Sequence, residues 1–310
     1  MAAGIIKTVD LTKSFGDTIA VDRLNLDIQK GELYGLVGPD GAGKTTTMRL
    51  LTAIMDATSG DASVAGHSIL SEGELIKEKI GYMSQRFGLY EDLTVMENII
   101  FYADIYEVPG KERPDRIERL LGFSNLTPFK DRLAGKLSGG MKQKLGLACA
   151  LIHTPEVLFL DEPTNGVDPV SRRDFWKILY GLLKEGVTIM VSTAYLDEAE
   201  RCTRIGLMHK GKILIEDVPK NVRSSLQKPM IEVWSDNARS SVDLVRNLGG
   251  VASVSLYGDR LHIMVEKKVP VAEIIANLKR LGIDVKDYRE ILPSLEDVFI
   301  SMVEKYAPLP

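Results

Sequence analysis

Short apolar segments alternate with amphipathic ones along the first two thirds of the chain. Four continuous apolar runs are typical of buried strands: Leu33–Val37, Ile80–Gln85, Val157–Leu160 and Val187–Ser192. Three segments with helical periodicity accompany them: Thr45–Ile54, Val170–Lys184 and Leu196–Arg201. Strands that alternate with helices predict an α/β fold, in which a largely parallel sheet is covered on both faces.

The other segments of this part predict shorter strands and a helical insertion. Strands are expected in four places: Ile5–Leu11, Leu24–Ile28, Ser59–Ile69 and a hairpin over Ile205–Ile215. From Leu93 to about Ala150 the apolar positions recur at helical spacing. We therefore expect a helical subdomain over about residues 90–150 instead of further strand–helix units.

The last third of the chain follows a different pattern, which begins after a break between Pro219 and Pro229. Strands and helices are predicted there in the order β-α-β-β-α-β. A last helix is predicted at Ser294–Tyr306, and its start, Ser-Leu-Glu-Asp, is close to a capping box. This order predicts a small ferredoxin-like α+β domain. We expect a first domain at 1–219, a linker at 220–229 and an accessory domain at 230–310.

The role of the accessory domain is open among a ligand sensor, a dimer brace and a passive appendage. We favour the brace, because alternating strands such as Leu261–Val265 offer an edge that can pair with another strand.

Composition narrows the class of protein. The formal net charge is −4 and 26% of residues are charged, so the chain as a whole is not attracted to nucleic acid or to an anionic membrane. Cys149 and Cys202 are its two cysteines, which fits a reducing compartment. Residues 1–11 lack the features of a signal peptide, and no apolar run is long enough to span a membrane. These features predict a soluble cytoplasmic chain.

A phosphate-binding loop is predicted directly after the strand Leu33–Val37. The segment Gly38–Thr45 agrees fully with the pattern G-x-x-x-x-G-K-T. Its glycines let backbone N–H groups turn toward a phosphate, while Lys44 can reach the β/γ oxygens and the Thr45 hydroxyl can bind Mg²⁺. A plain glycine turn is the less favoured reading, because the match is complete and lies between a strand and a helix.

Two further segments carry polar groups at places where a nucleotide site needs them. Asp161 and Glu162 end an apolar strand, where one carboxylate can hold a Mg²⁺ shell and the next can polarise water. Leu137–Met141 reads Leu-Ser-Gly-Gly-Met before a helix, which is typical of an anion site at a helix N-terminus. A serine N-cap followed by a tight glycine turn explains the same residues without a ligand.

Phe15 lies in a turn and has two interpretations. Ordinary packing at the end of a strand is favoured from the sequence alone, and stacking on an adenine ring is the alternative.

Together these motifs resemble the nucleotide-binding subunit of an ATP-binding cassette (ABC) transporter, over about Ile5–Pro219. The resemblance rests on five segments in the expected order: Gly38–Thr45, Gln85, Leu137–Met141, Leu160–Pro163 and Gly166–Pro169. Three others are similar to the ABC-2 exporter type, related to daunorubicin-resistance ATPases: Gly88–Val95, Gly140–Leu145 and Asp197–Glu200. A separate C-terminal appendage is usual in that family.

The resemblance implies ATP and Mg²⁺ as cofactors and a role for each matching residue. Phe15 would stack on adenine, and the loop would bind phosphates through Gly38, Asp40, Gly41, Ala42, Gly43, Lys44, Thr45 and Thr46. Thr45, Gln85 and Asp161 would complete the Mg²⁺ shell, with Glu162 as the general base. Ser138, Gly139 and Gly140 would act in trans on a partner's nucleotide, and Asp168 would couple the two sites. Residues from about Arg86 to Tyr106 would meet a membrane subunit.

The chain departs from the family pattern at two positions. Asp40 replaces the asparagine that is more usual in the loop, and its charge beside the phosphates predicts modestly weaker nucleotide binding. Ala194 occupies the position of the switch histidine, in Ser-Thr-Ala-Tyr instead of Ser-Thr-His. Alanine cannot bond to the γ-phosphate or position water, so the sequence predicts a site that binds ATP and hydrolyses it slowly.

The function that the resemblance implies is a cytoplasmic ATPase motor, attached to the inner face of the membrane through an ABC-2 type permease. The motor would pair head to tail with a second nucleotide-binding domain, in a homodimer or a heterodimer, and no nucleic acid partner is expected. Two alternatives are a regulatory ATP-binding module with little turnover and a soluble ABC ATPase that acts on ribosomes or DNA. The transported substance is not encoded in this chain.

Overall fold

The computed structural model describes residues 4–85, 88–226 and 228–306. The chain divides into two units, with the boundary between Glu216 and Asp217. The expected linker at 220–229 is therefore corrected, since residues 220–224 lie in helix α8 (Pro219–Ser224) of the second unit. Pro219 occupies the first turn of that helix, where its missing N–H breaks no hydrogen bond, so a proline that suggested a break begins a helix instead.

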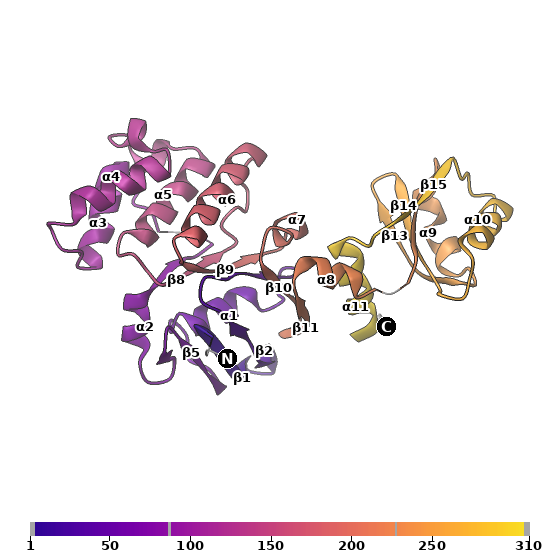
Figure 1. Cartoon of the computed structure of the whole chain (residues 1–310), viewed down its shortest axis with the longest axis horizontal. Coiled ribbons are helices and arrows are strands. Elements are labelled where there is room, and N and C mark those ends of the chain that lie inside the picture. The colour runs from indigo at the N-terminus through magenta and orange to yellow at the C-terminus, as the bar shows by residue number, and fades with distance from the viewer. Residues whose placement is uncertain (1–3, 86–87, 227, 307–310) are drawn as a thin grey trace. The chain divides into compact units, whose positions relative to one another are not determined.

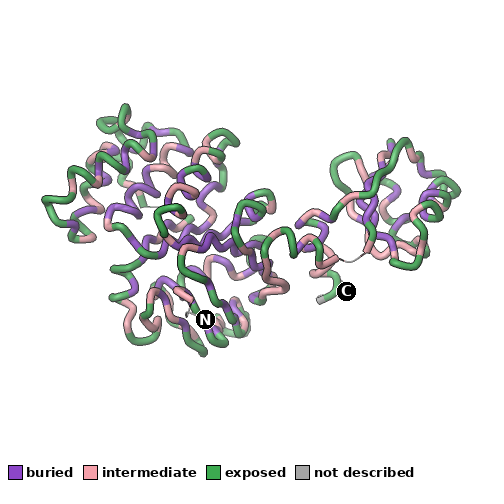
Figure 2. Tube along the Cα trace, viewed as in Figure 1, coloured by how far each residue is buried: buried purple, intermediate pink, exposed green. Residues whose placement is uncertain are grey.

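A six-stranded sheet forms the centre of the first unit, in the order β11-β10-β4-β9-β8-β7. Its strands are β4 (Leu33–Val37), β7 (Ile80–Met83), β8 (Val157–Asp161), β9 (Thr188–Thr193), β10 (Arg204–His209) and β11 (Lys212–Asp217). The four pairs from β10 to β7 are parallel, as the sequence predicts. Every residue of β4, β8 and β9 is buried, which explains their continuous apolar sequences (Figure 2).

A second sheet, which the sequence pattern does not distinguish from the first, is antiparallel. Its strands are β1 (Ile6–Phe15), β2 (Thr18–Leu24), β3 (Asp27–Ile28), β5 (Ser59–Val64) and β6 (His67–Ser68). They are ordered β2-β1-β5-β6, with β3 paired to β1. Phe15 ends strand β1 and is not part of the turn in which the sequence pattern places it, because that turn is confined to Gly16 and Asp17. Apolar side chains of both sheets and of α1 (Lys44–Leu51) share one core that includes Ile6, Leu36, Met48 and Val64.

Helices cover both faces of the parallel sheet (Figure 1). Helix α1 lies between it and the antiparallel sheet, whereas the predicted helical subdomain and α6 lie on the opposite side. The remaining helices of this unit are α2 (Gly73–Lys79), α3 (Val95–Ile105), α4 (Arg113–Phe123), α5 (Gly139–Leu151), α6 (Pro169–Lys184) and α7 (Leu196–Ala199). Short 3-10 turns at Thr127–Phe129 and Ala134–Lys136 link α4 to α5.

The second unit has the predicted β-α-β-β-α-β order. Its elements are β12 (Met230–Trp234), α9 (Ala238–Arg246), β13 (Val251–Tyr257), β14 (Arg260–Val265), α10 (Val271–Arg280), β15 (Asp287–Ile291) and α11 (Leu295–Tyr306). The antiparallel sheet is ordered β13-β14-β12-β15. Ile231 and Ile263 pack with Val245 and Ile274 in a core separate from that of the first unit.

The predicted edge at Leu261–Val265 is wrong. Strand β14 pairs with β13 on one side and β12 on the other, so its backbone groups are already hydrogen-bonded. The edges of this sheet are β13 and β15. Alternation along β14 reflects two differently covered faces and not an exposed edge.

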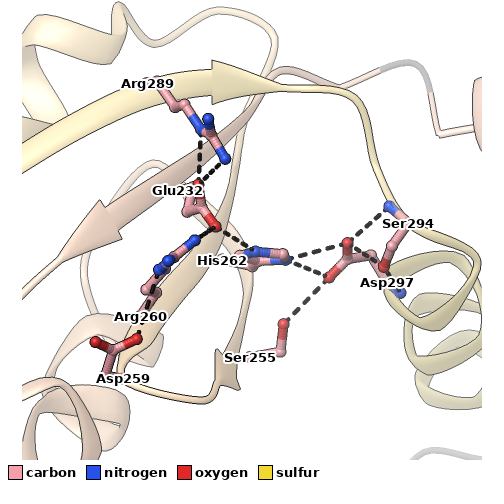
Figure 3. A network of polar contacts seen from close by, with 8 residues as sticks. All are labelled: Glu232, Ser255, Asp259, Arg260, His262, Arg289, Ser294 and Asp297. Carbon is pink, nitrogen blue, oxygen red and sulfur yellow. Dashed lines mark hydrogen bonds and ion pairs between the residues drawn. The ribbon is translucent and has the colours of Figure 1, made fainter.

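Charged side chains cover the face of this sheet opposite its apolar core (Figure 3). His262 on β14 lies between Glu232 on β12 and Asp297 on α11, with Nδ1 3.2 Å and 3.3 Å from the two Asp297 carboxylate oxygens. Its Nε2 is 3.5 Å from Glu232 Oε1. Asp297 also accepts hydrogen bonds from the backbone N–H and hydroxyl of Ser294, which confirms the predicted cap of the last helix.

Candidate functional site

The segment Gly38–Thr45 joins β4 to α1, as predicted, and wraps around the Lys44 side chain. Lys44 Nζ donates to the carbonyl oxygens of Gly38 (2.8 Å) and Pro39 (3.1 Å), and the side chain is only 4% exposed. Gly43 has φ +109°, and an added Cβ would lie 2.3 Å from the Ala20 carbonyl oxygen. Glycine is required there because a side chain fits neither the backbone conformation nor the space.

Asp161 and Thr45 lie side by side at the ends of β8 and the loop. The Thr45 hydroxyl donates to Asp161 Oδ1 at 3.1 Å, and the Ser192 hydroxyl donates to the same oxygen. Asp161 Oδ2 is buried and has no hydrogen-bond partner among the described residues. A buried carboxylate oxygen without a donor needs a cation or water, so this pair fits a Mg²⁺ site.

Glu162 directs its carboxylate at the lysine of the loop. Glu162 Oε1 is 3.0 Å from Lys44 Nζ, while Oε2 accepts hydrogen bonds from Gln85 Nε2 (3.1 Å) and Asn165 Nδ2 (3.4 Å). The backbone of Glu162 has φ +48°, a strained conformation for a residue with a side chain. Surrounding contacts must hold this residue in place, as is common at active sites.

A pocket of about 560 Å³ brings most of the predicted nucleotide-binding residues together. Its lining consists of Phe15, Ala20, Asp40, Gly41, Ala42, Gly43, Lys44, Thr45, Thr46, Gln85 and Glu162. Phe15 is half exposed, and Lys13 Nζ lies 5.2 Å from the centre of its ring. A flat aromatic face at the rim of a phosphate pocket is available for stacking.

The predicted signature residues are not part of this pocket lining. Ser138 is the N-cap of α5 and accepts a hydrogen bond from the Met141 N–H at 3.4 Å. Gly139 and Gly140 form the first turn of that helix. A Cβ on Gly140 would lie 2.4 Å from Ser171 Cβ, whereas a Cβ on Gly139 would meet nothing within 4 Å. Packing within this chain therefore explains the glycine at 140 but not the glycine at 139.

Asp168 and Ala194 also lie outside the pocket lining. Asp168 is the N-cap of α6, and its Oδ1 accepts from the N–H groups of Val170 (3.0 Å) and Ser171 (2.9 Å). Hydrogen bonds from Ser171 and Val170 lower the pKa of Asp168. Ala194 is exposed and directly follows β9, so its side chain provides no polar group.

Two contributors to the site are not among the predicted site residues. Ser192 and Asn165 each donate to a carboxylate of the site, Ser192 to Asp161 and Asn165 to Glu162. Ser192 begins the Ser-Thr-Ala-Tyr segment, but that motif does not indicate its contact, because the parallel pairing of β8 with β9 sets it beside Asp161. Asn165 lies in the segment after Glu162, but its amide is brought back to Glu162 by a turn that the sequence does not specify.

Comparison with known proteins agrees with this geometry. Residues 21–165 match the family model for ABC transporters, and residues 219–303 match the C-terminal domain of DrrA1-3-like ATP-binding proteins. A dimeric bacterial ABC transporter cassette, MJ0796, superimposes with a TM-score of 0.63 and 27% identity, covering 69% of this chain and 98% of that one.

Two curated relatives match over nearly their whole length. The bacitracin transport ATP-binding protein BcrA of Bacillus licheniformis is 33% identical, covering 96% of this chain and 97% of the relative. The daunorubicin/doxorubicin resistance ATP-binding protein DrrA of Streptomyces peucetius is 32% identical, covering 96% and 92%. The chain therefore belongs to the ABC transporter ATP-binding proteins, in the group that carries a DrrA-like C-terminal domain.

A third relative is longer. The probable multidrug ABC transporter ATP-binding protein YbhF of Escherichia coli is 42% identical over 93% of this chain, and the chain spans about half the length of that protein. In the part of the chain that the structure describes, no helix is both long and apolar enough to cross a membrane.

Proposed function

We propose that this chain is the ATP-binding and ATP-hydrolysing motor subunit of an ABC-2 type exporter. The observation that carries the proposal is the set of contacts around Glu162, where a carboxylate, the loop lysine Lys44 and the polar amide of Gln85 meet. The Asp161–Thr45 pair lies directly beside them. Hydrolysis of ATP needs a base, a phosphate-binding cation and a metal site in one pocket.

The chemistry follows from these positions. Lys44 exchanges Glu162 for the β/γ-phosphate oxygens, and Glu162 then accepts the proton of the attacking water. Thr45, Asp161 and Gln85 are the residues that would hold Mg²⁺, which would supply positive charge against the phosphates. Asp40 adds one negative charge at the pocket, which weakens nucleotide binding modestly.

The complete site requires a second nucleotide-binding domain. Ser138, Gly139 and Gly140 would close on the γ-phosphate held by the partner's loop, and Asp168 would couple the two sites. The exposed N-terminus of α5 supports this assignment, because open N–H groups and the helix dipole attract a phosphate. ATP held between two protomers stabilises the closed pair, and hydrolysis releases it.

A groove beside α3 supports docking of a permease on the cytoplasmic side of the membrane. The groove is about 810 Å³ in volume, and Ile54, Ile105 and Tyr106 contribute apolar surface to it. Ile54 is 58% exposed and Ile105 is 55% exposed, which leaves a hydrophobic contact surface for a short helix. Glu74, Glu78 and Glu107 outnumber Lys77 in the lining, so a basic permease segment fits. The expected contact region begins at Arg86, but residues 86–87 lie outside the described residues.

Docking is tested by purification from detergent-solubilised membranes. We expect the wild-type chain to co-purify with a multi-span membrane protein, and the Ile54→Glu/Ile105→Glu variant to lose it while still binding ATP. Leu244→Glu is the matched control, because Leu244 is similarly exposed in the second unit. Recovery with ribosomes or DNA instead of a membrane protein would favour the soluble ABC alternative.

Ala194 supports slow hydrolysis at the chain's own loop and an asymmetric pair with a histidine-bearing partner. Three of the histidines are engaged elsewhere: His67 pairs with Glu72, His153 with the Ile80 carbonyl and His262 with Asp297. A regulatory module with little turnover remains the second candidate, favoured by the same alanine.

Single-turnover hydrolysis distinguishes these two candidates. We expect Ala194→His to raise the rate at least about ten-fold, because the histidine restores a donor at the γ-phosphate. The double variant Ala194→His/Glu162→Gln is the control, because it lacks the general base. A rate unchanged by the histidine would contradict the impaired-site proposal.

A further inference from the structure

A hydrogen-bonded chain connects the loop that follows β9 to the Glu162 carboxylate. The Tyr195 hydroxyl lies 3.4 Å from Asn165 Oδ1, and Asn165 Nδ2 lies 3.4 Å from Glu162 Oε2. A tyrosine hydroxyl donates to the amide oxygen at one end, and the amide N–H donates to the carboxylate at the other. The amide oxygen of Asn165 accepts one hydrogen bond and the amide nitrogen donates the other, so the orientation of the amide is determined.

Tyr195 is itself held on two sides. The Arg172 guanidinium lies 4.4 Å from the centre of the Tyr195 ring, in cation–π contact. The Tyr195 N–H donates to the Thr193 hydroxyl at 3.0 Å. The cation–π contact and the backbone hydrogen bond limit the positions that the Tyr195 hydroxyl can take relative to Asn165.

One buried carboxylate anchors the residues that hold Tyr195. Glu198 is fully buried and accepts hydrogen bonds from the hydroxyls of Thr193 (2.9 Å) and Thr164. Its Oε1 also lies 3.4 Å from Arg172 Nε. A buried charge with several partners is costly to displace, so the whole set forms a fixed support behind the site.

Glu162 needs such support because its other partners have separate tasks. In the proposed ATPase, Lys44 binds phosphate and Gln85 binds the metal, so neither remains on the carboxylate during hydrolysis. Asn165 is the donor that stays. Because the φ of Glu162 is strained, contacts from other residues must keep this residue in place. Ala194 has no polar side chain that could supply one.

We propose that Asn165 and Tyr195 are positioning residues, which hold the Glu162 carboxylate toward the attacking water. The proposal rests on the proposed hydrolysis of ATP. In that step the water oxygen bonds to the γ-phosphorus, its proton passes to Glu162, and the bond to the β–γ bridging oxygen breaks with its electron pair leaving on ADP. Asn165 transfers no proton. Its role is to keep the Glu162 carboxylate oriented toward the attacking water.

Single-turnover hydrolysis by the full chain at saturating Mg-ATP tests the proposal, in the natural and in the Ala194→His background. We expect Asn165→Ala and Tyr195→Phe to lower the rate by about ten-fold, since misorientation of a base costs rate and not binding. The affinity for a fluorescent ATP analogue should stay within about two-fold of wild type. Tyr288→Phe is the matched control, an exposed tyrosine of the second unit.

Rescue by a conservative variant separates positioning from simple structural support. Asn165→Gln keeps an amide donor near Glu162 Oε2, so it should recover part of the rate that Asn165→Ala loses. Wild-type rates in Asn165→Ala and Tyr195→Phe would overturn the proposal, as would equal losses of affinity and rate. Chains that bind Mg-ATP but hydrolyse none of it in either background would overturn the proposed hydrolysis and, with it, the positioning roles. Failure to bind Mg-ATP at all would instead overturn the proposed function itself.

Discussion

At the scale of single residues, the two adjacent glycines of the signature differ in the space around them. Gly140 has no room for a methyl group, because Ser171 Cβ and Oγ lie 2.4 Å and 2.5 Å from the position of its Cβ. Gly139 has open space around it. A side chain at 139 is therefore excluded only if another molecule covers the N-terminus of α5.

The variants Gly139→Ala and Gly140→Ala test this difference. Gly140→Ala should lower the free energy of unfolding of the first unit by about 1–3 kcal/mol, because overpacking forces α5 away from α6. Gly139→Ala should leave that free energy unchanged or slightly raised while it slows ATP hydrolysis, since the methyl group enters the paired interface. Thermal unfolding and steady-state turnover measure the two effects, and normal turnover in Gly139→Ala would argue against closure in trans.

At the scale of elements, the docking of α11 depends on a charged histidine. Both ring nitrogens of His262 face carboxylates, Nδ1 facing Asp297 and Nε2 facing Glu232 (Figure 3). A neutral imidazole has only one N–H, so two acceptors favour the protonated ring. Burial opposes that charge, but the hydrogen bonds and charges of Asp297 and Glu232 outweigh it and raise the pKa of His262. The Tyr257 ring stacks on the imidazole, with 4.9 Å between the two ring centres.

This arrangement predicts that the second unit loses stability as pH rises. A folded-state pKa above the ordinary value near 6.5 gives stability that is complete below about pH 6.5 and disappears as pH rises through the raised value. His262→Asn should unfold more easily at pH 6 by about 1–3 kcal/mol and lose this dependence, because the buried Asp297 carboxylate loses its cation, whereas Glu232 keeps its ion pairs with Arg260 and Arg289.

Tryptophan fluorescence can follow that transition. Trp234 lies in the second unit and Trp176 in the first, so urea unfolding of a Trp176→Phe chain reports on the second unit. His67→Asn is the control, since the His67–Glu72 pair is partly exposed and lies in the first unit. Parallel pH dependences in wild type and His262→Asn would show that another group is responsible.

At the scale of the whole molecule, the proposed pairing of two chains rests on the phosphate pocket and the signature helix. The pocket lining includes the loop, Gln85 and Glu162 but none of Ser138, Gly139 and Gly140. ATP bound between two such surfaces adds contacts from both protomers, which makes pairing depend on nucleotide.

Pairing is testable in a variant that binds ATP without turnover. We expect Glu162→Gln to elute at twice the monomer mass with Mg-ATP and as a monomer without nucleotide, as measured by light scattering. Lys44→Ala should remain monomeric in both conditions, because the phosphate loses its main cation. A Glu162→Gln chain that binds ATP and stays monomeric would point to a different partner chain.

The sequence by itself determined the alternation of elements and the local motifs. The loop Gly38–Thr45, the end of β8 at Asp161 and the cap at Ser294 are specified by residues a few positions apart, so spacing was sufficient to predict them. Continuous apolar runs also predicted the buried parallel strands, because both faces of such a sheet are covered. The β-α-β-β-α-β order of the second unit followed in the same way.

Contacts between distant residues depend on how the strands pair and the helices pack. Strand pairing placed Ser192 beside Asp161, made β14 an interior strand and separated an antiparallel sheet from the parallel one. The same folding brought Asn165 and Tyr195 to Glu162, and His262 between two carboxylates. Such contacts join segments whose separation along the chain carries no signal, since register and turn geometry are set by packing and not by local pattern.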